Sequence, residues 1–402
     1  MRQIRKIAYI IYLLGFIYYC ISPYLLVTYL SKNIFYNALG EKYNNFYLGT
    51  FAYFSILYFI FYTIGYYFGS KGKIYKKNID YDLSMINFQA LIVSLVYFIA
   101  MVFIIDINEL VKFTGYIDGY DVVHRGQLTT LYLTSIFWYI YFFGNNRKSY
   151  TLCKIILIVC IITSGFNLVM LGSRLGLISG LLVLFINKRI ENINKDKSLY
   201  SWPLFAGLLI TSAIVVMIML GISRSGDDLS YDNFIYIIFS EPMFIYASVP
   251  SYLDAVDVNF FNIPIDIITA IIGSTPSFIF ENKSEFFDSF NSIPGEAASG
   301  FGGLNHIVAI LANFGIIGFP IYSITEGIYF GVLVKNIKRG RFYYAVALCN
   351  IALFPFTIFR DGFQTSIKLG LFNYMLFPFI IILIINSIHR FIFKKIFFNL
   401  KL

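Results

Sequence analysis

The chain has 402 residues, of which 58% are hydrophobic, 20% aromatic and only 13% charged, and its mean hydropathy is +0.72. A soluble domain carries about a quarter charged residues, so this composition is typical of a protein embedded in lipid. The formal net charge of +9 does not indicate nucleic-acid binding, because the basic residues fall in short clusters between apolar runs. All four cysteines lie inside apolar runs, so we expect neither a disulfide nor thiol chemistry.

Ten apolar runs approach the roughly 20 residues that a helix needs to cross a membrane. They lie at about Ile7–Leu30, Leu48–Phe68, Leu83–Ile105, Leu128–Phe143, two within Leu152–Ile186, Pro203–Ser223, Ile316–Val334, Phe342–Phe359 and Gly370–Ile388. The sequence therefore predicts an all-α polytopic membrane protein of about 10–12 transmembrane helices, folded as a single integral membrane domain over residues 1–402.

The basic residues predict the orientation of these helices. Six segments between or beyond the runs hold 22 of the 31 Lys and Arg residues but only four of the 22 acids. They are residues 1–6, 69–82, 144–154, 187–202, 335–341 and 389–402. Under the positive-inside rule these segments face the cytoplasm, so both termini are expected to be cytoplasmic.

One long segment, residues 225–305, is not explained by these ten runs. It holds eleven acidic residues and a single base, Lys283, and the orientation rule predicts that it forms a long extracytoplasmic loop. Its two apolar runs, 233–253 and 264–280, are interrupted by prolines, which favours short interfacial helices over further spans. The glycine-rich stretch 295–303 is a plausible hinge, and its spacing fits no phosphate-binding motif.

Four arginines lie on the predicted outer side, against the charge rule: Arg125, Arg174, Arg224 and Arg360. Lys154 and Lys188 are only 34 residues apart, so the turn that carries Arg174 is expected to lie below the membrane surface. A guanidinium offers a planar fork of donors that matches phosphate oxygens, and several converging arginines would suit a diphosphate. The alternative is that each arginine extends to the interface or pairs with a nearby acid, such as Arg360 with Asp361.

His306 and Glu241 are the candidate catalytic bases. His306 directly follows the glycine-rich stretch and starts an apolar run, and an imidazole can take a proton from an alcohol near neutral pH. Its alternative role is to cap the helix. Glu241 lies in an apolar run that Pro242 interrupts, so its carboxylate is expected to project into a cavity. Glu326, in the middle of another run, suggests proton coupling as a competing function.

No cofactor or metal site is expected. Asp227-Asp228 and the pair Asp118 and Asp121 leave Mg²⁺ open, although acid pairs in outer loops are mostly solvated. Cys and His show no zinc-type spacing.

The layout resembles the Wzy-type polymerases of O-antigen and capsular polysaccharide, within the O-antigen polymerase/ligase superfamily. Three pieces carry the resemblance: Leu171-Gly-Ser-Arg174-Leu-Gly, the long outer loop opened by Arg224, and the stretch from Leu304-Asn-His306 to Gly315-Ile-Ile-Gly318. The resemblance implies a GT-C-like fold in the cytoplasmic membrane, with undecaprenyl-diphosphate-linked oligosaccharides as substrates. A flippase and a chain-length regulator are the further partners that it suggests, besides membrane lipids.

The sequence thus predicts a glycosyltransferase that polymerises lipid-linked repeat units on the outer membrane face, with the arginines binding the leaving diphosphate. Two alternatives stay open. An O-antigen ligase would share this chemistry but use a different acceptor. A flippase or transporter would be expected to show repeated halves and helices broken at mid-membrane, and the sequence indicates neither.

Overall fold

The computed structural model describes residues 2–26, 45–72, 82–105, 125–147, 149–170, 174–194, 231–275, 280 and 303–399. Within these ranges the chain forms helices and no β-strand, apart from one isolated bridge between Leu304 and Asp361, which confirms the all-α class. Several predicted features lie outside these ranges: the span at 203–223, Arg224, the acid pairs at 118–121 and 227–228, and most of the glycine-rich stretch.

Seven helices of the described chain are long and apolar enough to cross a membrane. They are Arg2–Leu25, Phe46–Ser70, Leu83–Ile104, Thr151–Val169, His306–Asn336, Arg341–Phe363 and Ile367–Ile392. These helices support a multi-pass membrane protein, whereas the total of ten spans and the positions of the termini stay predictions. Two other predicted runs are helices, α7 (Arg125–Phe143) and α9 (Arg174–Asn194), but they do not meet the same criteria of length and apolar composition.

The chain divides into two compact units. The first comprises Met1–Lys73, Ile214–Lys335 and Leu353–Gly370, and the second comprises Ile74–Ala213, Asn336–Ala352 and Leu371–Leu402. We describe each unit by itself, and the single domain over residues 1–402 stays a prediction.

The second unit contains α5 (Leu83–Ile104), α7, α8 (Thr151–Met170), α9, the start of α16 (Arg341–Ser366), most of the π-helix η9 (Ile367–Leu376) and α17 (Phe377–Asn399). Its core is aromatic: Trp138 is buried and donates to the Tyr97 hydroxyl at 3.1 Å. Asp82 caps α5 by accepting hydrogen bonds from Ser84, and these bonds hold the pKa of Asp82 below its usual value.

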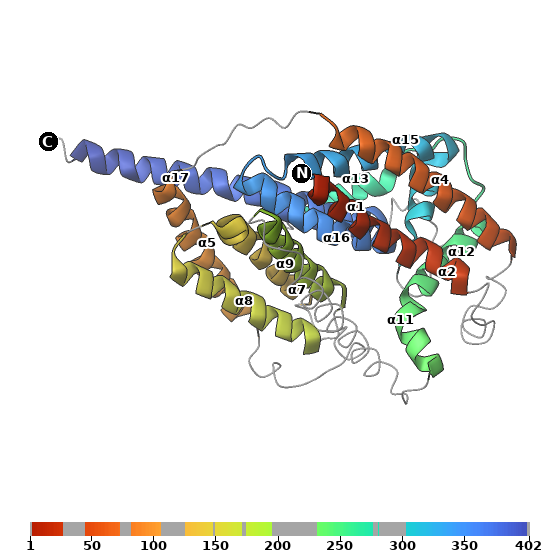
Figure 1. Ribbon diagram of the computed structural model, residues 1–402, viewed down its shortest axis with the longest axis horizontal. Coiled ribbons are helices and arrows are strands. Elements are labelled where there is room, and N and C mark those ends of the chain that lie inside the picture. Colours follow the sequence, from red (N-terminus) through yellow and green to blue (C-terminus); the bar gives the residue numbers. More distant parts are fainter. Residues whose placement is uncertain are drawn as a thin grey trace. The chain divides into compact units, whose positions relative to one another are not determined.

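The first unit is built around the N-terminal helices α1 (Arg2–Phe16) and α4 (Asn45–Ser70) and the long helix α15 (His306–Asn336). A π-helical turn, η1 (Ile17–Ile21), joins α1 to α2 (Ser22–Leu25). Three shorter helices complete the unit: α11 (Tyr231–Tyr246), α12 (Ser248–Ala255) and α13 (Ile265–Ser274). Figure 1 shows α1 and α4 running alongside one another, consistent with the 3.1 Å hydrogen bond between Tyr9 and Thr63.

Glycines bring α4 and α15 into backbone contact. A Cβ atom added at Gly65 would lie 2.1 Å from the Ile324 carbonyl oxygen, and one at Gly327 would lie 2.2 Å from the Tyr62 carbonyl oxygen. Gly69 and Gly331, each four residues further along, make equally close approaches. Two glycines four residues apart on each helix let transmembrane helices pack backbone to backbone. This contact fixes α4, with its Tyr58 and Tyr62, directly beside Glu326.

α15 is not straight: it breaks at Gly315, whose φ of 67° and ψ of −170° are non-helical. We call residues 306–314 its first arm and residues 316–336 its second arm. In a continuous helix, residues twenty apart are separated by about 30 Å, yet His306 contacts Glu326 at 2.8 Å. The chain therefore folds back at Gly315, and within the candidate span His306–Asn336 only the second arm, which begins at the predicted Ile316, has the roughly 20 residues that a crossing needs.

The acidic segment 225–305 is partly built into the first unit. Its described helices α11, α12 and α13 have 16, 8 and 10 residues, and none of them is a candidate span. They do not simply cover a surface, because Met243, Tyr246 and Tyr252 are at most 1% exposed. Apolar side chains of this segment thus complete the core in which Glu241 lies.

Candidate functional site

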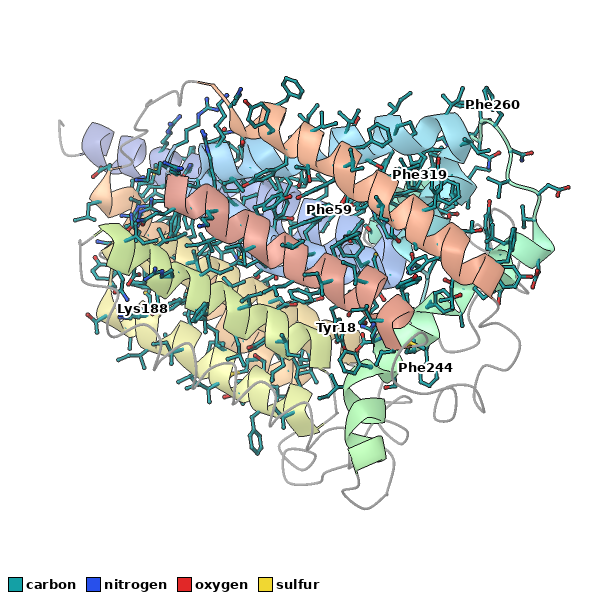
Figure 2. The ribbon with its side chains drawn as sticks, turned by 45° about the vertical axis from the view of Figure 1, so that its right-hand side comes forward. Tyr18, Phe59, Lys188, Phe244, Phe260 and Phe319 are labelled. Carbon is teal, nitrogen blue, oxygen red and sulfur yellow. The ribbon has the colours of Figure 1, made fainter. Side chains whose placement is uncertain are left out.

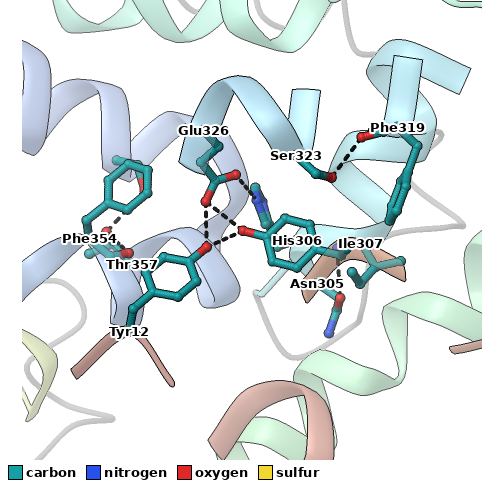
Figure 3. Close-up of polar contacts among 11 residues, drawn as sticks. Tyr12, Asn305, His306, Ile307, Phe319, Ser323, Glu326, Phe354 and Thr357 are labelled. Carbon is teal, nitrogen blue, oxygen red and sulfur yellow. Dashed lines mark hydrogen bonds and ion pairs between the residues drawn. The ribbon is translucent and has the colours of Figure 1, made fainter. Parts of the chain in front are cut away.

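A buried polar cluster links three helices of the first unit. His306 Nε2 lies 2.8 Å from Glu326 Oε2, and the hydroxyls of Tyr12 and Tyr58 donate to Glu326 Oε1 at 2.7 and 2.6 Å. The two hydroxyls also contact one another. His306 is 0% exposed and Glu326 is 4% exposed, so the cluster has no contact with solvent. Figure 3 shows Glu326 between Tyr12 and His306.

Two hydroxyl protons serve three contacts in this cluster. Tyr12 and Tyr58 carry one hydroxyl proton each, but they take part in three contacts: two with Glu326 and one with each other. Two protons cannot fill three hydrogen bonds at once, so the two hydroxyls and Glu326 Oε1 share them. His306 Nδ1 is buried and has no hydrogen-bond partner among the described residues. The cluster therefore leaves hydrogen-bonding capacity unused, in one contact of the hydroxyls and at His306 Nδ1.

Aromatic rings enclose the imidazole of His306. Phe359, Phe363, Tyr58 and Tyr322 all place their ring centroids within 6 Å of its own, at 5.7, 5.8, 5.3 and 5.9 Å. Tyr62 stacks on Tyr12 with a centroid separation of 3.7 Å. Rings on every side strengthen the electrostatic coupling of the His306–Glu326 pair, because they keep water away from it.

A second, more accessible cluster joins α11 to the end of α16. Arg360 Nε lies 2.7 Å from Glu241 Oε1 and 3.6 Å from Asp361 Oδ1, and the Tyr19 hydroxyl donates to Glu241 Oε1 at 3.3 Å. The side chains of Arg360 and Glu241 are 30% and 28% exposed. A soluble ligand or an exposed headgroup can therefore reach this pair, whereas the His306–Glu326 pair is closed.

The short segment of chain that precedes α15, residues 303–305, connects the two clusters. Leu304 N donates to the Arg360 carbonyl at 2.9 Å, and Asn305 N donates to Ser248 Oγ at 3.0 Å. Gly362, directly after Asp361, has a φ of 59° and kinks α16 at this point. His306, which follows Asn305 and begins α15, contacts Glu326 through its Nε2. The backbone of Arg360 is thus bonded to Leu304, which lies only two residues before His306.

The structure brings together some of the residues that the sequence singled out. Glu241 and Arg360 form an ion pair, and the predicted partner Asp361 is also present, at a longer distance. His306 does begin a helix, but the cap is Asn305, whose Oδ1 accepts from Ile307 N at 2.9 Å. Arg125 and Arg174 are the first residues of α7 and α9, where their side chains fall outside the description, as Arg224 does entirely. Convergence of the arginines stays a prediction.

Sequence reasoning missed the tyrosines of both clusters. Tyr12, Tyr19 and Tyr58 were grouped with the general aromatic excess of 33 tyrosines and 44 phenylalanines. A weak signal was present on α4, where Tyr58, Tyr62 and Tyr66 recur every four residues and so share one helix face. Among the described residues, no three His, Cys, Asp or Glu side chains gather as metal ligands.

These features define a multi-pass helical membrane protein with a buried His–Glu–Tyr network beneath a part-exposed Arg–carboxylate cluster. No protein-family model, curated protein or solved structure matches the chain.

Proposed function

We propose that this protein is a membrane glycosyltransferase with a GT-C-like fold, which polymerises undecaprenyl-diphosphate-linked repeat units into O-antigen or capsular polysaccharide. The observation that carries the proposal is the Arg360–Glu241 pair. It combines a diphosphate-binding group with a carboxylate base at 2.7 Å, and about 30% of each side chain is accessible. The bundle would work on the outer face of the cytoplasmic membrane.

In this proposal the arriving diphosphate competes with Glu241 for the guanidinium of Arg360. A diphosphate carries more charge than a carboxylate and offers oxygens in pairs, which suits the arginine fork. Glu241 is then released from its ion pair and takes the proton of the acceptor hydroxyl. The acceptor oxygen attacks the anomeric carbon, the bond from that carbon to the diphosphate oxygen breaks, and Arg360 neutralises the charge on the leaving group.

This arrangement favours Glu241 over His306 as the base. A general base must come within about 2.6–3.2 Å of the proton that it removes, directly or through one water. His306 is 0% exposed and its Nε2 is already engaged by Glu326, whereas Glu241 lies in the accessible cluster. His306 acts in this scheme as a positioning residue, because it holds the segment that contains Leu304 against Arg360.

The test uses purified enzyme and lipid-linked repeat units, with product length followed by gel electrophoresis. Glycans of many repeats attached to the lipid carrier support polymerase activity. Transfer only to a lipid A-core acceptor would indicate the ligase instead. If neither acceptor is extended under conditions in which the protein stays folded, the transferase proposal fails.

A proton-coupled transporter of lipid-linked oligosaccharides is the second candidate, and one observation favours it. Carboxylates inside membrane bundles commonly mark proton pathways, and transporters place such groups beside broken helices. Glu326 lies in this setting, since the arms of α15 on either side of Gly315 pair through His306 and Glu326. The sequence indicates no helix broken at mid-membrane, and the break at Gly315 could not be seen in it, because a positive φ at glycine leaves no trace in hydropathy. Proton uptake coupled to lipid flipping in vesicles would select this function.

A further inference from the structure

The bend in α15 is held by a segment of chain for which the sequence predicts short interfacial helices in the long outer loop. We call residues 258–274, which include α13, the clamp segment. Ile316 N and Ile317 N, the first donors of the second arm, bond the carbonyls of Asn259 and Phe260, both at 3.1 Å. A Cβ atom at Gly315 would lie 2.7 Å from the Asn259 oxygen, so only glycine allows this approach.

Residues of the clamp segment also form hydrogen bonds with the end of the first arm, before the bend. Asn262 Nδ2 donates to the Ala312 carbonyl at 2.9 Å, at the end of the first arm. Asn313 and Asp266 exchange two bonds: Asp266 N donates to Asn313 Oδ1 at 2.9 Å, and Asn313 Nδ2 donates to Asp266 Oδ2 at 2.7 Å. Asn259 Nδ2 donates to Asn262 Oδ1 at 3.1 Å. The polar groups of the bend are therefore hydrogen-bonded within the protein. A bend exposed to water could instead form these hydrogen bonds with solvent.

Apart from Asn259, the exposed side chains of the clamp segment are apolar. Phe260, Phe261 and Ile263 are 68%, 67% and 66% exposed, and Ile268 and Ile271 of α13 are 48% and 41% exposed. Figure 2 shows Phe260 at the outer edge of its loop. The polar residues Thr269 and Asp266 are turned toward the protein, where Thr269 is buried and Asp266 bonds Asn313. Such an arrangement, with polar groups inside and apolar groups outside, is the reverse of a water-exposed loop.

These exposed residues continue the lipid-facing surface of a spanning helix. Ile316, Ile317 and Ile321 of the second arm are 46%, 42% and 61% exposed, and this face of a candidate span lies in the bilayer. Phe260 is hydrogen-bonded to Ile317, so its side chain lies at the same level. Irregular backbone is tolerated in hydrocarbon only where its polar groups are bonded within the protein, which is the condition met here.

We infer that the clamp segment is inserted in the bilayer, with Phe260, Phe261, Ile263, Ile268 and Ile271 in contact with lipid acyl chains. The first arm of α15 is then a re-entrant half-helix that the inserted segment closes from the lipid side. Asp254 and Asp257, which are exposed and precede the clamp segment, mark the edge of insertion. The inference does not depend on the proposed reaction.

The test places a nitroxide label on single cysteines at Phe260, Phe261 and Ile268 of the full chain, in vesicles of phosphatidylethanolamine and phosphatidylglycerol. The matched control is Asp257→Cys, on the same segment of chain. The native cysteines Cys20, Cys153, Cys160 and Cys349 are all buried, and unmodified protein gives the background. Collisions with oxygen, which dissolves in lipid, are compared with collisions with a water-soluble nickel chelate.

Labels at 260, 261 and 268 are expected to collide with oxygen and to lose most of their collisions with the chelate, while the label at 257 shows the reverse. Equal access of the chelate to all four sites would overturn the inference, since the segment would then lie in water. Protection from both reagents at 260, 261 and 268 would also overturn it, because protein rather than lipid would cover them. Phe261→Trp in a background of Trp138→Phe and Trp202→Phe gives a second measurement, with quenching by brominated acyl chains expected.

Discussion

Tyr12 and Tyr19 lie seven residues apart on the first span, and each donates its hydroxyl to a different carboxylate: Tyr12 to Glu326 and Tyr19 to Glu241. Tyr12 lies in α1, and Tyr19 lies in the π-helical turn η1 that continues it. One N-terminal helix thus contacts both the buried cluster and the accessible cluster. The two tyrosines offer a matched pair of substitutions that separates stability from activity.

Tyr12→Phe is expected to lower the free energy of unfolding by about 1–3 kcal/mol, because it removes a buried hydrogen bond to a carboxylate. Tyr19→Phe is expected to leave unfolding in detergent almost unchanged and to alter turnover instead, since Glu241 is part-exposed. Tyr53→Phe, on a residue that is 61% exposed, serves as the control. Equal effects of Tyr12→Phe and Tyr53→Phe on unfolding would contradict the buried network.

Removal of the Glu326 side chain is expected to destabilise the protein strongly. The substitution leaves His306 Nε2 buried without its partner, and an unsatisfied buried polar group costs about 1–3 kcal/mol. Glu326→Ala should therefore unfold far earlier than Thr325→Ala, on the exposed neighbour. A double-mutant cycle with His306→Asn measures the coupling, which we expect to exceed about 0.5 kcal/mol. Additive effects of the two substitutions would show that the pair is not energetically linked.

Gly65→Ala is expected to disrupt the contact between α4 and α15. Its methyl group would lie 2.1 Å from the backbone oxygen of Ile324, which cannot move aside as a flexible side chain would. Overpacking of this kind costs typically about 1–3 kcal/mol. Gly49→Ala, on the same helix, meets nothing within 4 Å and is the control. The measurement is the fraction of protein that stays monodisperse in detergent after heating, and similar curves for both variants would refute the packing.

Arg360→Lys is expected to impair polymerisation nearly as much as Arg360→Ala. Lysine keeps the charge but lacks the Nε donor that holds Glu241 at 2.7 Å and the planar fork that suits a diphosphate. Glu241→Gln should lower turnover by about 10²–10⁴-fold if Glu241 is the general base. The control is Lys368→Arg, a conservative change at a nearby charged residue. Wild-type chain lengths from Arg360→Lys at normal protein levels would exclude this arginine from diphosphate binding.

The orientation is tested by impermeant thiol labelling of intact cells. Asp257→Cys is expected to react from outside, and Lys71→Cys, in a basic segment, is expected to react only after the membrane is opened. Both native residues are exposed in the structure, so access to reagent depends on the side of the membrane. The opposite labelling pattern would reverse the orientation and with it the outer-face reaction.

Hydropathy predicted the limits of several helices closely. The run expected at Leu83–Ile105 is a helix over Leu83–Ile104, and the run expected to end at Phe143 does end there. Such limits follow from composition alone, because a span must hold about 20 apolar residues whatever its neighbours are. The same reasoning identified Glu241, Glu326, His306 and Arg360 as residues that need a partner.

The partners themselves could not be predicted. Tyr12 and Glu326 are 314 residues apart, and nothing in either local sequence indicates the other. The fold-back at Gly315 depends on one backbone conformation, stabilised by the carbonyls of Asn259 and Phe260 in the loop between α12 and α13. Hydropathy is an average over a window and carries no information about such a reversal. For the same reason it could not show that His306 is enclosed while Glu241 is accessible.

The contact between the Tyr12 and Tyr58 hydroxyls has a consequence for the order in which the protein is made. Both residues belong to the first 70 residues of the chain, whereas Glu326 is synthesised more than 250 residues later. An unbonded hydroxyl in hydrocarbon is costly, and during this interval the two tyrosines can satisfy one another. The two N-terminal helices can therefore pair in the membrane before Glu326 is synthesised, and the carboxylate joins the two hydroxyls when α15 inserts.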